Sequence, residues 1–160
     1  MHSPKILVLD IETAPAMGYF WSILNTNIGI SQIVNASKLI CFAAKWIGDK
    51  KIHFYSNHKD THKKMVKEAW NLINEADAIV GYNSQAFDMK VLNREFLLEN
   101  LPKPDHYKNI DLLKTVKGNF KFISNKLDHV SRELGIGKKT SHQGFDLWQS
   151  CMNNDSKAWK

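Results

Sequence analysis

The segment that most constrains the fold is an apolar run near the N-terminus that ends in two acids, KILVLDIET. Its composition predicts a central β-strand over residues 5–13. Side chains two positions apart on a strand project to the same face, so Asp10 and Glu12 point the same way. Two like charges repel each other unless a cation lies between them. The strand therefore predicts a cation site on one face of a sheet.

The composition predicts one domain. The chain has 160 residues, 43% of them hydrophobic, which suits a single domain over residues 1–160 with a real core. No apolar run approaches the length of a membrane span, and the N-terminus lacks the layout of a signal peptide, so we expect a cytoplasmic protein without membrane contact. Cys41 and Cys151 are too few for a disulfide framework and are predicted to be reduced.

The charge balance indicates an anionic partner, although it also fits many ordinary soluble proteins. The formal net charge is +6 and the isoelectric point is about 9.3. It becomes more informative when acids gather in a site while lysines lie elsewhere. A metal-dependent enzyme that acts on phosphates divides its charges in this way.

The rest of the chain predicts a mixed sheet covered by helices. Two strand segments after the first are joined by a turn at Gly48-Asp49, and a helical crossover leads into a further buried strand. Such sheets bind ligands at the carboxyl ends of their parallel strands, where DIET and GYNSQAFD lie. The predicted segments are an irregular insertion over 15–36, strands over 37–48, 50–56 and 77–83, and helices over 60–76, 87–100 and 124–135, the last with Ser124 as N-cap.

Two motifs carry a family resemblance. LDIET together with IVGYNSQAFDMKVLN resembles the first two motifs of the DEDD 3′-to-5′ exonucleases. NIDLLKTVKGNFKFISNKLDHVSRELGIGKKT resembles predicted exonucleases of phages and bacteria that are related to the proofreading domain of family B DNA polymerases. The resemblance implies an α/β domain of the ribonuclease H-like fold, with a mixed five-stranded sheet flanked by helices.

The resemblance also implies an activity. It implies a metal-dependent 3′-to-5′ exonuclease that hydrolyses single-stranded DNA, with DNA favoured over RNA as the nucleic-acid partner. Replication or repair proteins are further expected partners, and a phage-encoded chain would act in the host cytoplasm. Two rival predictions stay open: a nucleic-acid-binding domain of the same fold that has lost hydrolysis, and an endonuclease or resolvase on that fold.

The implied cofactor is a pair of Mg²⁺ or Mn²⁺ ions. Two divalent ions activate a water and neutralise charge on the leaving oxygen, and carboxylates are the ligands that such ions prefer. By resemblance, Asp10 bridges both metals, Glu12 holds the water-activating metal and Asp88 supports the second. The alternatives are a solvated strand end for Asp10 and Glu12, and a charge at a helix N-terminus for Asp88.

Five further residues are predicted to contact the substrate: Thr13, Asn83, Phe87, Asn125 and Lys126. Asn83 is also typical of a turn, and Phe87 of a core aromatic. Capping or a solvated surface is the alternative for Asn125 and Lys126.

One tryptophan and three histidines lead to separate predictions. Trp21, in the insertion, is a candidate for base stacking. His53, His58 and His62 straddle a strand end and a helix start, and we predict that they lie on the surface.

The sequence departs from the DEDD pattern after residue 135. A fourth carboxylate is needed on a late helix, in a Y-x-x-x-D or H-x-x-x-x-D setting, and neither motif occurs there. Asp146 is predicted to face outward from a helix whose apolar stripe is Phe145, Trp148 and Met152, and Asp155 to cap a final turn. We therefore expect the chain to stop before the helix with the last ligand, and to be a poor nuclease by itself.

Overall fold

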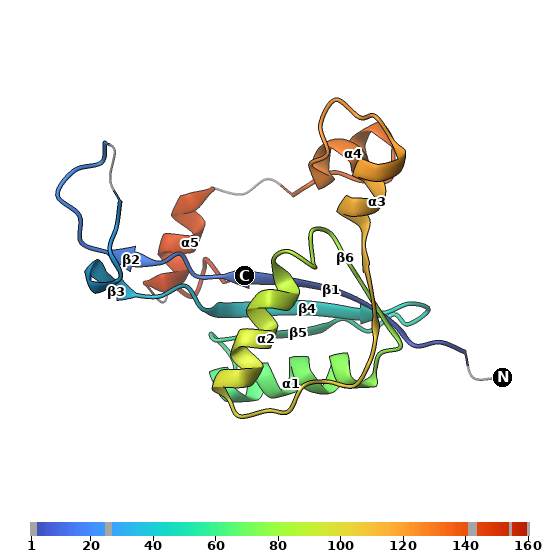
Figure 1. Ribbon diagram of the computed structural model, residues 1–160, viewed down its shortest axis with the longest axis horizontal. Coiled ribbons are helices and arrows are strands. Elements are labelled where there is room, and N and C mark those ends of the chain that lie inside the picture. Colours follow the sequence, from blue (N-terminus) through green and yellow to red (C-terminus); the bar gives the residue numbers. More distant parts are fainter. Residues whose placement is uncertain (1–2, 25–26, 141–143, 154, 160) are drawn as a thin grey trace.

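The chain folds around one five-stranded sheet with helices packed against it (Figure 1). A computed structural model describes residues 3–24, 27–140, 144–153 and 155–159. The strands of the sheet are β1 (Ile6–Thr13), β4 (Leu39–Trp46), β5 (His53–Ser56), β6 (Ala78–Gly81) and β7 (Lys108–Asp111). The helices are α1 (His62–Glu75), α2 (Asp88–Leu98), α3 (Leu112–Asn119), α4 (Leu127–Glu133) and α5 (Phe145–Met152).

The sheet is mixed, as the order of the segments predicts. Its strands lie in the order β5-β4-β1-β6-β7. β4 pairs antiparallel with β1 and β5, whereas β6 runs parallel to β1 and to β7. The three parallel strands therefore bring their carboxyl ends to one region, where α/β sheets bind ligands. The predicted fold class, a mixed five-stranded sheet flanked by helices, is confirmed.

β1 lies in the middle of the sheet and alternates buried with exposed side chains. Leu7, Leu9 and Ile11 are at most 4% exposed and belong to the core that the sheet shares with α1 and α2. Asp10 and Glu12 lie on the opposite, exposed face. The alternation thus separates the core of the domain from the face that carries the acids.

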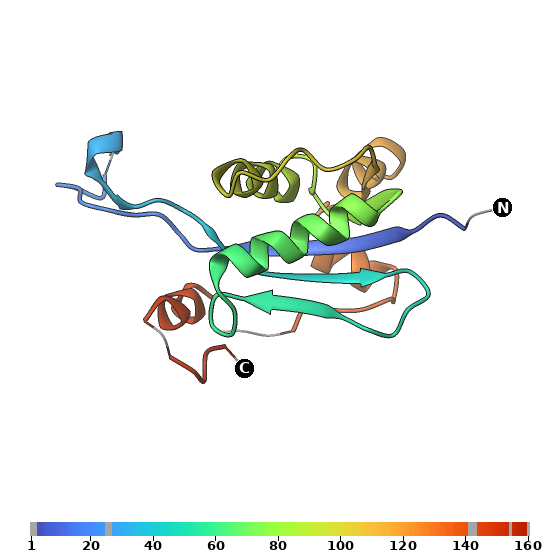
Figure 2. The same cartoon turned by 90° about the horizontal axis from the view of Figure 1, so that it is seen from below.

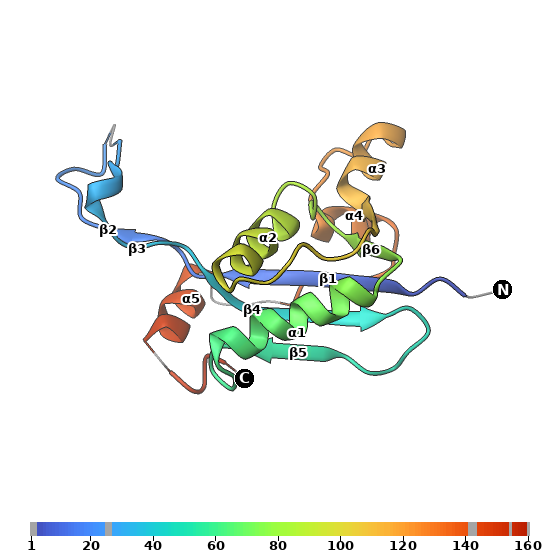
Figure 3. The same cartoon turned by 60° about the horizontal axis from the view of Figure 1, so that its bottom comes forward.

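Two helices cover the core face of the sheet. α1 begins after Thr61, whose hydroxyl accepts a hydrogen bond from the backbone N–H of Lys64 at 3.3 Å. α2 packs beside α1 and against β4 (Figures 2 and 3). The buried residues of α1 follow the predicted helical spacing and are Met65, Val66, Ala69, Leu72 and Ile73.

The insertion over 15–36 is more regular than the sequence predicts. β2 (Met17–Gly18) pairs antiparallel with β3 (Ile33–Asn35), and this two-stranded ribbon projects from the rest of the domain (Figures 1 and 3). Residues 13–37 contain no Asp, Glu, Lys, Arg or His. Trp21 is fully exposed at 101%. The ribbon is an uncharged and largely apolar projection. Its two short strands are formed by main-chain pairing, and their sequence does not alternate clearly between apolar and polar residues, so no strand is predicted there.

The two predicted helices after residue 120 are present, with two differences. α4 begins after Lys126 and not after Ser124, because the Ser124 hydroxyl accepts a hydrogen bond from the backbone N–H of Lys126 at 3.3 Å in a turn before the helix. α5 buries Cys151, whereas Phe145 and Met152 of the predicted apolar stripe are 67% and 37% exposed. Gly135 ends α4 with a φ of 67°, as predicted.

Two further sequence predictions concern the cysteines and membranes. Cys41 and Cys151 are both free thiols. Burial raises the pKa of Cys41 to about 12, so this thiol is protonated at neutral pH. Within the described ranges, no helix combines the length and the apolarity needed to cross a membrane.

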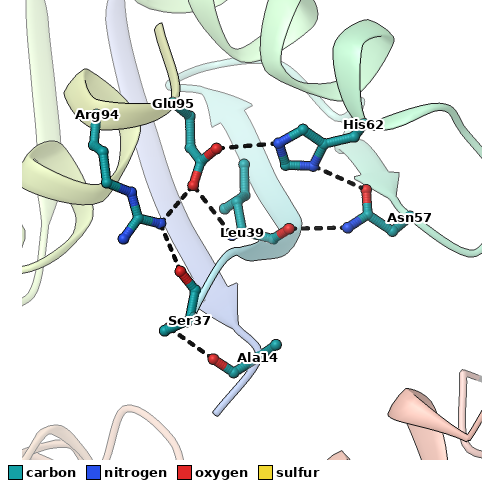
Figure 4. A network of polar contacts seen from close by, with 7 residues as sticks. All are labelled: Ala14, Ser37, Leu39, Asn57, His62, Arg94 and Glu95. Atoms are coloured by element: carbon teal, nitrogen blue, oxygen red, sulfur yellow. Dashed lines mark hydrogen bonds and ion pairs between the residues drawn. The ribbon is translucent and has the colours of Figure 1, made fainter. Parts of the chain in front are cut away.

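A polar network centred on the buried Glu95 joins the start of β4 to both covering helices (Figure 4). Glu95 of α2 is 3% exposed; its Oε1 accepts a hydrogen bond from Arg94 Nη2 at 2.6 Å, and its Oε2 lies 3.1 Å from His62 Nε2. Arg94 also donates to the carbonyl of Ser37 at 3.0 Å, and the Ser37 hydroxyl donates to the carbonyl of Ala14 at 2.7 Å. These contacts fix the point where the chain leaves β1 and enters β4.

Candidate active site

Asp10 and Glu12 share the exposed face of β1. Partial burial raises the pKa of both carboxyl groups above their ordinary values. The negative charges of Asp10 and Asp88 raise the pKa of Glu12 further. The three predicted ligands therefore act on one another electrostatically, and the structure brings them together in one site.

Asp88 reaches this site from the first residue of α2. Its side chain is 3% exposed, and its Oδ1 accepts a hydrogen bond from the backbone N–H of Ile11 at 3.2 Å. This bond ties the start of α2 to the stretch of β1 between the other two acids. Burial, with the charges of Asp10 and Asp111, raises the pKa of Asp88 to about 6. A nearby cation would lower the pKa of Asp88 again, because a positive charge favours the charged carboxylate.

The loop between β6 and α2 is held by Asp111 at the end of β7. Asp111 Oδ1 accepts hydrogen bonds from the backbone N–H groups of Asn83 at 2.8 Å and Leu113 at 3.0 Å. Its Oδ2 accepts one from the N–H of Gln85 at 3.2 Å. Because both oxygens accept hydrogen bonds from the backbone, Asp111 positions the loop that carries Asp88.

Gly81 lets this loop approach the sheet closely. A Cβ at Gly81 would lie 2.6 Å from the Cβ of Ser84 and 3.2 Å from the carbonyl oxygen of Leu9. Ser84 is fully buried and donates to Asn109 Oδ1 at 3.1 Å. The loop is therefore packed between β1 and β7, which fixes where α2 begins.

Lys139 is a cation at the site that the sequence motifs do not reveal. It lies in the segment after α4, and its positive charge lowers the pKa of Asp10 and of Glu12 against the larger effect of burial. Its backbone N–H donates a hydrogen bond to Asp128 Oδ1 at 2.6 Å. Lys139 is distant from both acids in the chain, so no local pattern points to it.

The acid cluster fits a divalent cation by its chemistry. All three side chains are carboxylates, the donors that Mg²⁺ and Mn²⁺ prefer. In the part of the chain that the structure describes, no group of three or more His, Cys, Asp or Glu side chains is gathered tightly enough to hold a metal as it stands. The raised pKa of Glu12 beside Asp10 and Asp88 is the electrostatic condition that a bound cation would remove.

Asp146 and Asp155 are the two acids that follow residue 135 in the sequence. Asp146 is exposed in the first turn of α5, as predicted. Asp155 is also exposed, and its Oδ1 accepts a hydrogen bond from the backbone N–H of Lys157 at 2.9 Å, which caps the final turn. The carboxylates that raise the pKa of Glu12 are Asp10 and Asp88.

Three of the predicted substrate contacts belong to the two segments that carry the acids. Thr13 follows Glu12 and lines a cavity of about 380 Å³ together with Phe145 and Trp148. Phe87 is 42% exposed at the N-cap of α2, so it is not a core aromatic. Asn83 has a φ of 65°, a left-handed conformation that is typical of asparagine in a turn. This favours the turn over substrate contact as the reason for an asparagine at this position.

Asn125 and Lys126 lie just before α4. The Asn125 carbonyl accepts a hydrogen bond from the Tyr82 hydroxyl at 2.7 Å, which links this segment to the loop that leads to Asp88. Asn125 Oδ1 is buried and has no hydrogen-bond partner among the described residues. Lys126 is exposed. Both residues therefore belong to a segment attached to the acid site.

The electrostatics of Asp88 predict a stability effect. Because its folded pKa of about 6 exceeds the ordinary value of 3.8, Asp88 contributes stability below pH 3.8 that is lost as the pH rises through 6. Asp88→Asn keeps an oxygen for the Ile11 N–H but buries no charge. We expect the metal-free variant to be more stable than the parent at about pH 8, by on the order of 1–3 kcal/mol.

Thermal unfolding in EDTA from about pH 4 to pH 8 measures this difference. The gain should shrink toward the acid end, where the parent carboxyl is also neutral. Asp105→Asn, at an exposed position, is the matched control and should show no such trend. A variant less stable than the parent at about pH 8 would contradict the assignment of a buried charge.

The fold and the acid cluster together define an α/β protein of the RNase H-like class. Residues 29–159 match the RNase_H superfamily, and the chain belongs to that superfamily. The match includes Asp88 and begins after Asp10 and Glu12. A comparison with curated proteins found no match.

A solved structure supports the same fold. The chain is similar to the family B DNA polymerase from the hyperthermophilic archaeon Pyrobaculum calidifontis, with a TM-score of 0.63 and 19% sequence identity. The similarity covers 99% of this chain and 22% of the polymerase chain. RNase H-like nucleases generally use divalent metal ions. The superfamily and the site therefore favour a nucleic-acid nuclease.

Proposed function

We propose that this chain is the nuclease domain of a metal-dependent 3′-to-5′ exonuclease that hydrolyses single-stranded DNA. The observation that carries the proposal is the convergence of Asp10, Glu12 and Asp88 at the carboxyl ends of parallel strands. Membership of the RNase_H superfamily supports hydrolysis of nucleic acid. The 3′-to-5′ direction is supported by the resemblance of the two motifs to DEDD exonucleases.

Asp10, Glu12 and Asp88 would be the residues that hold two Mg²⁺ or Mn²⁺ ions. When bound, the ions supply an activated water and neutralise charge on the leaving 3′ oxygen. The chain's own groups set the geometry. Ile11 N–H fixes the Asp88 carboxylate, and Lys139 adds positive charge beside the other two acids.

A second candidate is a nucleic-acid-binding domain of the same fold that does not hydrolyse its ligand. It is favoured by the positions of Asp146 and Asp155, since one is exposed and the other caps a turn. An endonuclease on this fold is the remaining alternative. The products of a single digestion distinguish all three.

The test is digestion of a 5′-labelled single-stranded DNA with Mg²⁺ or Mn²⁺, with EDTA as the control. We expect a ladder that shortens stepwise from the 3′ end, and protection when the 3′-terminal linkages are phosphorothioates. Internal fragments that ignore this protection would indicate an endonuclease. Retention of the labelled strand without cleavage, in either metal, would favour the binding domain.

A further inference from the structure

The positive charge of the chain is concentrated in one part of the fold. Residues 112–140, here called the basic lobe, contain seven of the 22 Lys and Arg residues and only two acidic residues. This excess accounts for most of the net charge of +6. The lobe comprises α3, α4 and the segments that follow them, on the far side of α2 from the β2–β3 ribbon (Figures 1 and 3). The two projections of the domain thus have opposite characters, one basic and one uncharged.

Three lysines of the basic lobe are available to an anionic ligand. Lys117, Lys121 and Lys126 are exposed. The ion pairs among the described residues involve none of them, although Arg132 in the same lobe pairs with Asp128. Exposed lysines without acidic partners are what phosphate binding requires.

Exposed aromatic rings lie between these lysines in the chain. Phe120 is 59% exposed, and its ring centroid lies 6.0 Å from that of half-buried Phe122. The two rings are tilted at 49°, so they do not cover each other by stacking. Lysines beside exposed rings are the combination that binds single-stranded nucleic acid, because phosphates pair with lysine and bases stack on the rings.

The basic lobe is attached directly to the acid site. Asp111 caps the start of α3 and also clamps the loop that carries Asp88. Lys114 Nζ donates a hydrogen bond to Gln85 Oε1 in that loop, and the Tyr82 hydroxyl binds the Asn125 carbonyl. A strand bound on the lobe would therefore be held at a defined position relative to the carboxylates.

We infer that the basic lobe is the binding platform for the single strand that leads into the acid site. Lys117, Lys121 and Lys126 contact phosphates, and a base stacks on Phe120. The inference rests on the proposed function for the direction of the strand, but binding to the lobe needs neither metal nor hydrolysis. An acidic protein would also be attracted by the lysines, but it would gain little from the exposed Phe120 ring.

The test measures binding of a fluorescent oligo-dT of about 12 nucleotides in EDTA over a range of salt concentrations. In Lys117→Gln/Lys121→Gln, we expect weaker binding and a salt slope smaller by about 1.4, since each phosphate contact on a single strand contributes about 0.7. Phe120→Ala should weaken binding roughly 5- to 100-fold with an unchanged salt slope, because it removes stacking and no charge. Lys59→Gln/Lys63→Gln carries the same charge change at exposed positions near the start of α1 and should keep the parent slope.

Three results would overturn the inference. One is an equal loss in both lysine pairs, which would mean that only net charge matters. Another is parent affinity in Phe120→Ala, with its fold verified by thermal unfolding. The third is tighter binding of poly-glutamate than of oligo-dT through the same lysines, which would assign the lobe to an acidic protein.

The outcome is separable from that of the proposed function. A parent that cleaves no DNA but shows these binding effects would contradict the exonuclease and leave the platform standing. A parent that digests DNA stepwise while the basic-lobe variants bind normally would contradict the platform alone.

Discussion

Asp10→Ala is expected to lower the rate of DNA hydrolysis about a thousandfold, since a metal ligand supports several kcal/mol of transition-state stabilisation. The charge of Asp10 raises the pKa of both Glu12 and Asp88, and by resemblance Asp10 is the residue assigned to both ions. Binding of single-stranded DNA should remain close to that of the parent, because the substitution leaves Lys117, Lys121 and Lys126, the exposed lysines assigned to the phosphates, unchanged. Initial rates on a 3′-overhang substrate with Mg²⁺ measure the loss.

The same variant should lose the stabilisation that metal gives the parent. A ligand that binds only the folded state raises its stability, so Mn²⁺ should raise the melting temperature of the parent more than that of Asp10→Ala. Asp105→Ala removes an exposed carboxylate elsewhere and serves as the control for both measurements. Cleavage by Asp10→Ala at the parent rate would show that the acid cluster is not the catalytic centre.

The parts of this site that the sequence predicts are those with local patterns. The alternation of apolar and acidic side chains in β1 separates Asp10 and Glu12 from the core. A strand followed by the start of a helix places Asp88 beyond the carboxyl end of that strand. Helix α1 follows its apolar spacing almost to the residue. In each case the deciding interaction lies within a few residues of the pattern.

The parts that the sequence does not predict depend on contacts between distant segments. β7 has only four residues, and it becomes a strand by pairing with β6. Asp111 caps the start of α3, but its second role requires the N–H groups of Asn83 and Gln85, which come from another loop. Lys139 is more than 120 residues from Asp10 and Glu12 in the chain, and only the tertiary fold brings its charge near them. A strand of four residues, or a single residue that acts far from its neighbours in the chain, leaves no periodic pattern in the sequence.

The polar network around Glu95 is the other feature without a local pattern. His62 was predicted to lie on the surface, whereas its ring contacts Glu95 Oε2 at 3.1 Å and Asn57 Oδ1 at 3.3 Å. The Asn57 side-chain amide donates to the carbonyl of Leu39 at 2.9 Å, which orients its oxygen toward the ring. From the sequence alone, a glutamate in the middle of an amphipathic helix is expected to face solvent. Only the packing of α2 against α1 and β4 shows that Glu95 is buried.

Glu95→Ala is therefore expected to lower the free energy of unfolding by about 1–3 kcal/mol, the cost of losing the hydrogen bonds to a buried carboxylate. The variant removes the acceptor for Arg94 and the partner of His62, and it leaves the backbone N–H of Leu39 without the carboxylate oxygen that lies 3.5 Å away. Urea unfolding at about pH 7 measures the loss. Glu99→Ala, a half-exposed glutamate at the end of the same helix, should change the stability by less than about 0.5 kcal/mol.

The pH dependence distinguishes a lost ion pair from a simple loss of packing. Burial alone would raise the pKa of Glu95, but hydrogen bonds from Arg94 and His62 outweigh it and hold the pKa below its ordinary value of 4.5. A carboxyl group with a lowered folded pKa contributes stability above its unfolded pKa and loses it as the pH falls through the folded value. The difference between the parent and Glu95→Ala should therefore narrow as the pH drops below 4.5. A difference that stays constant there would mean that the side chain stabilises the fold by its volume, and that the junction between β1 and β4 is not held by charge.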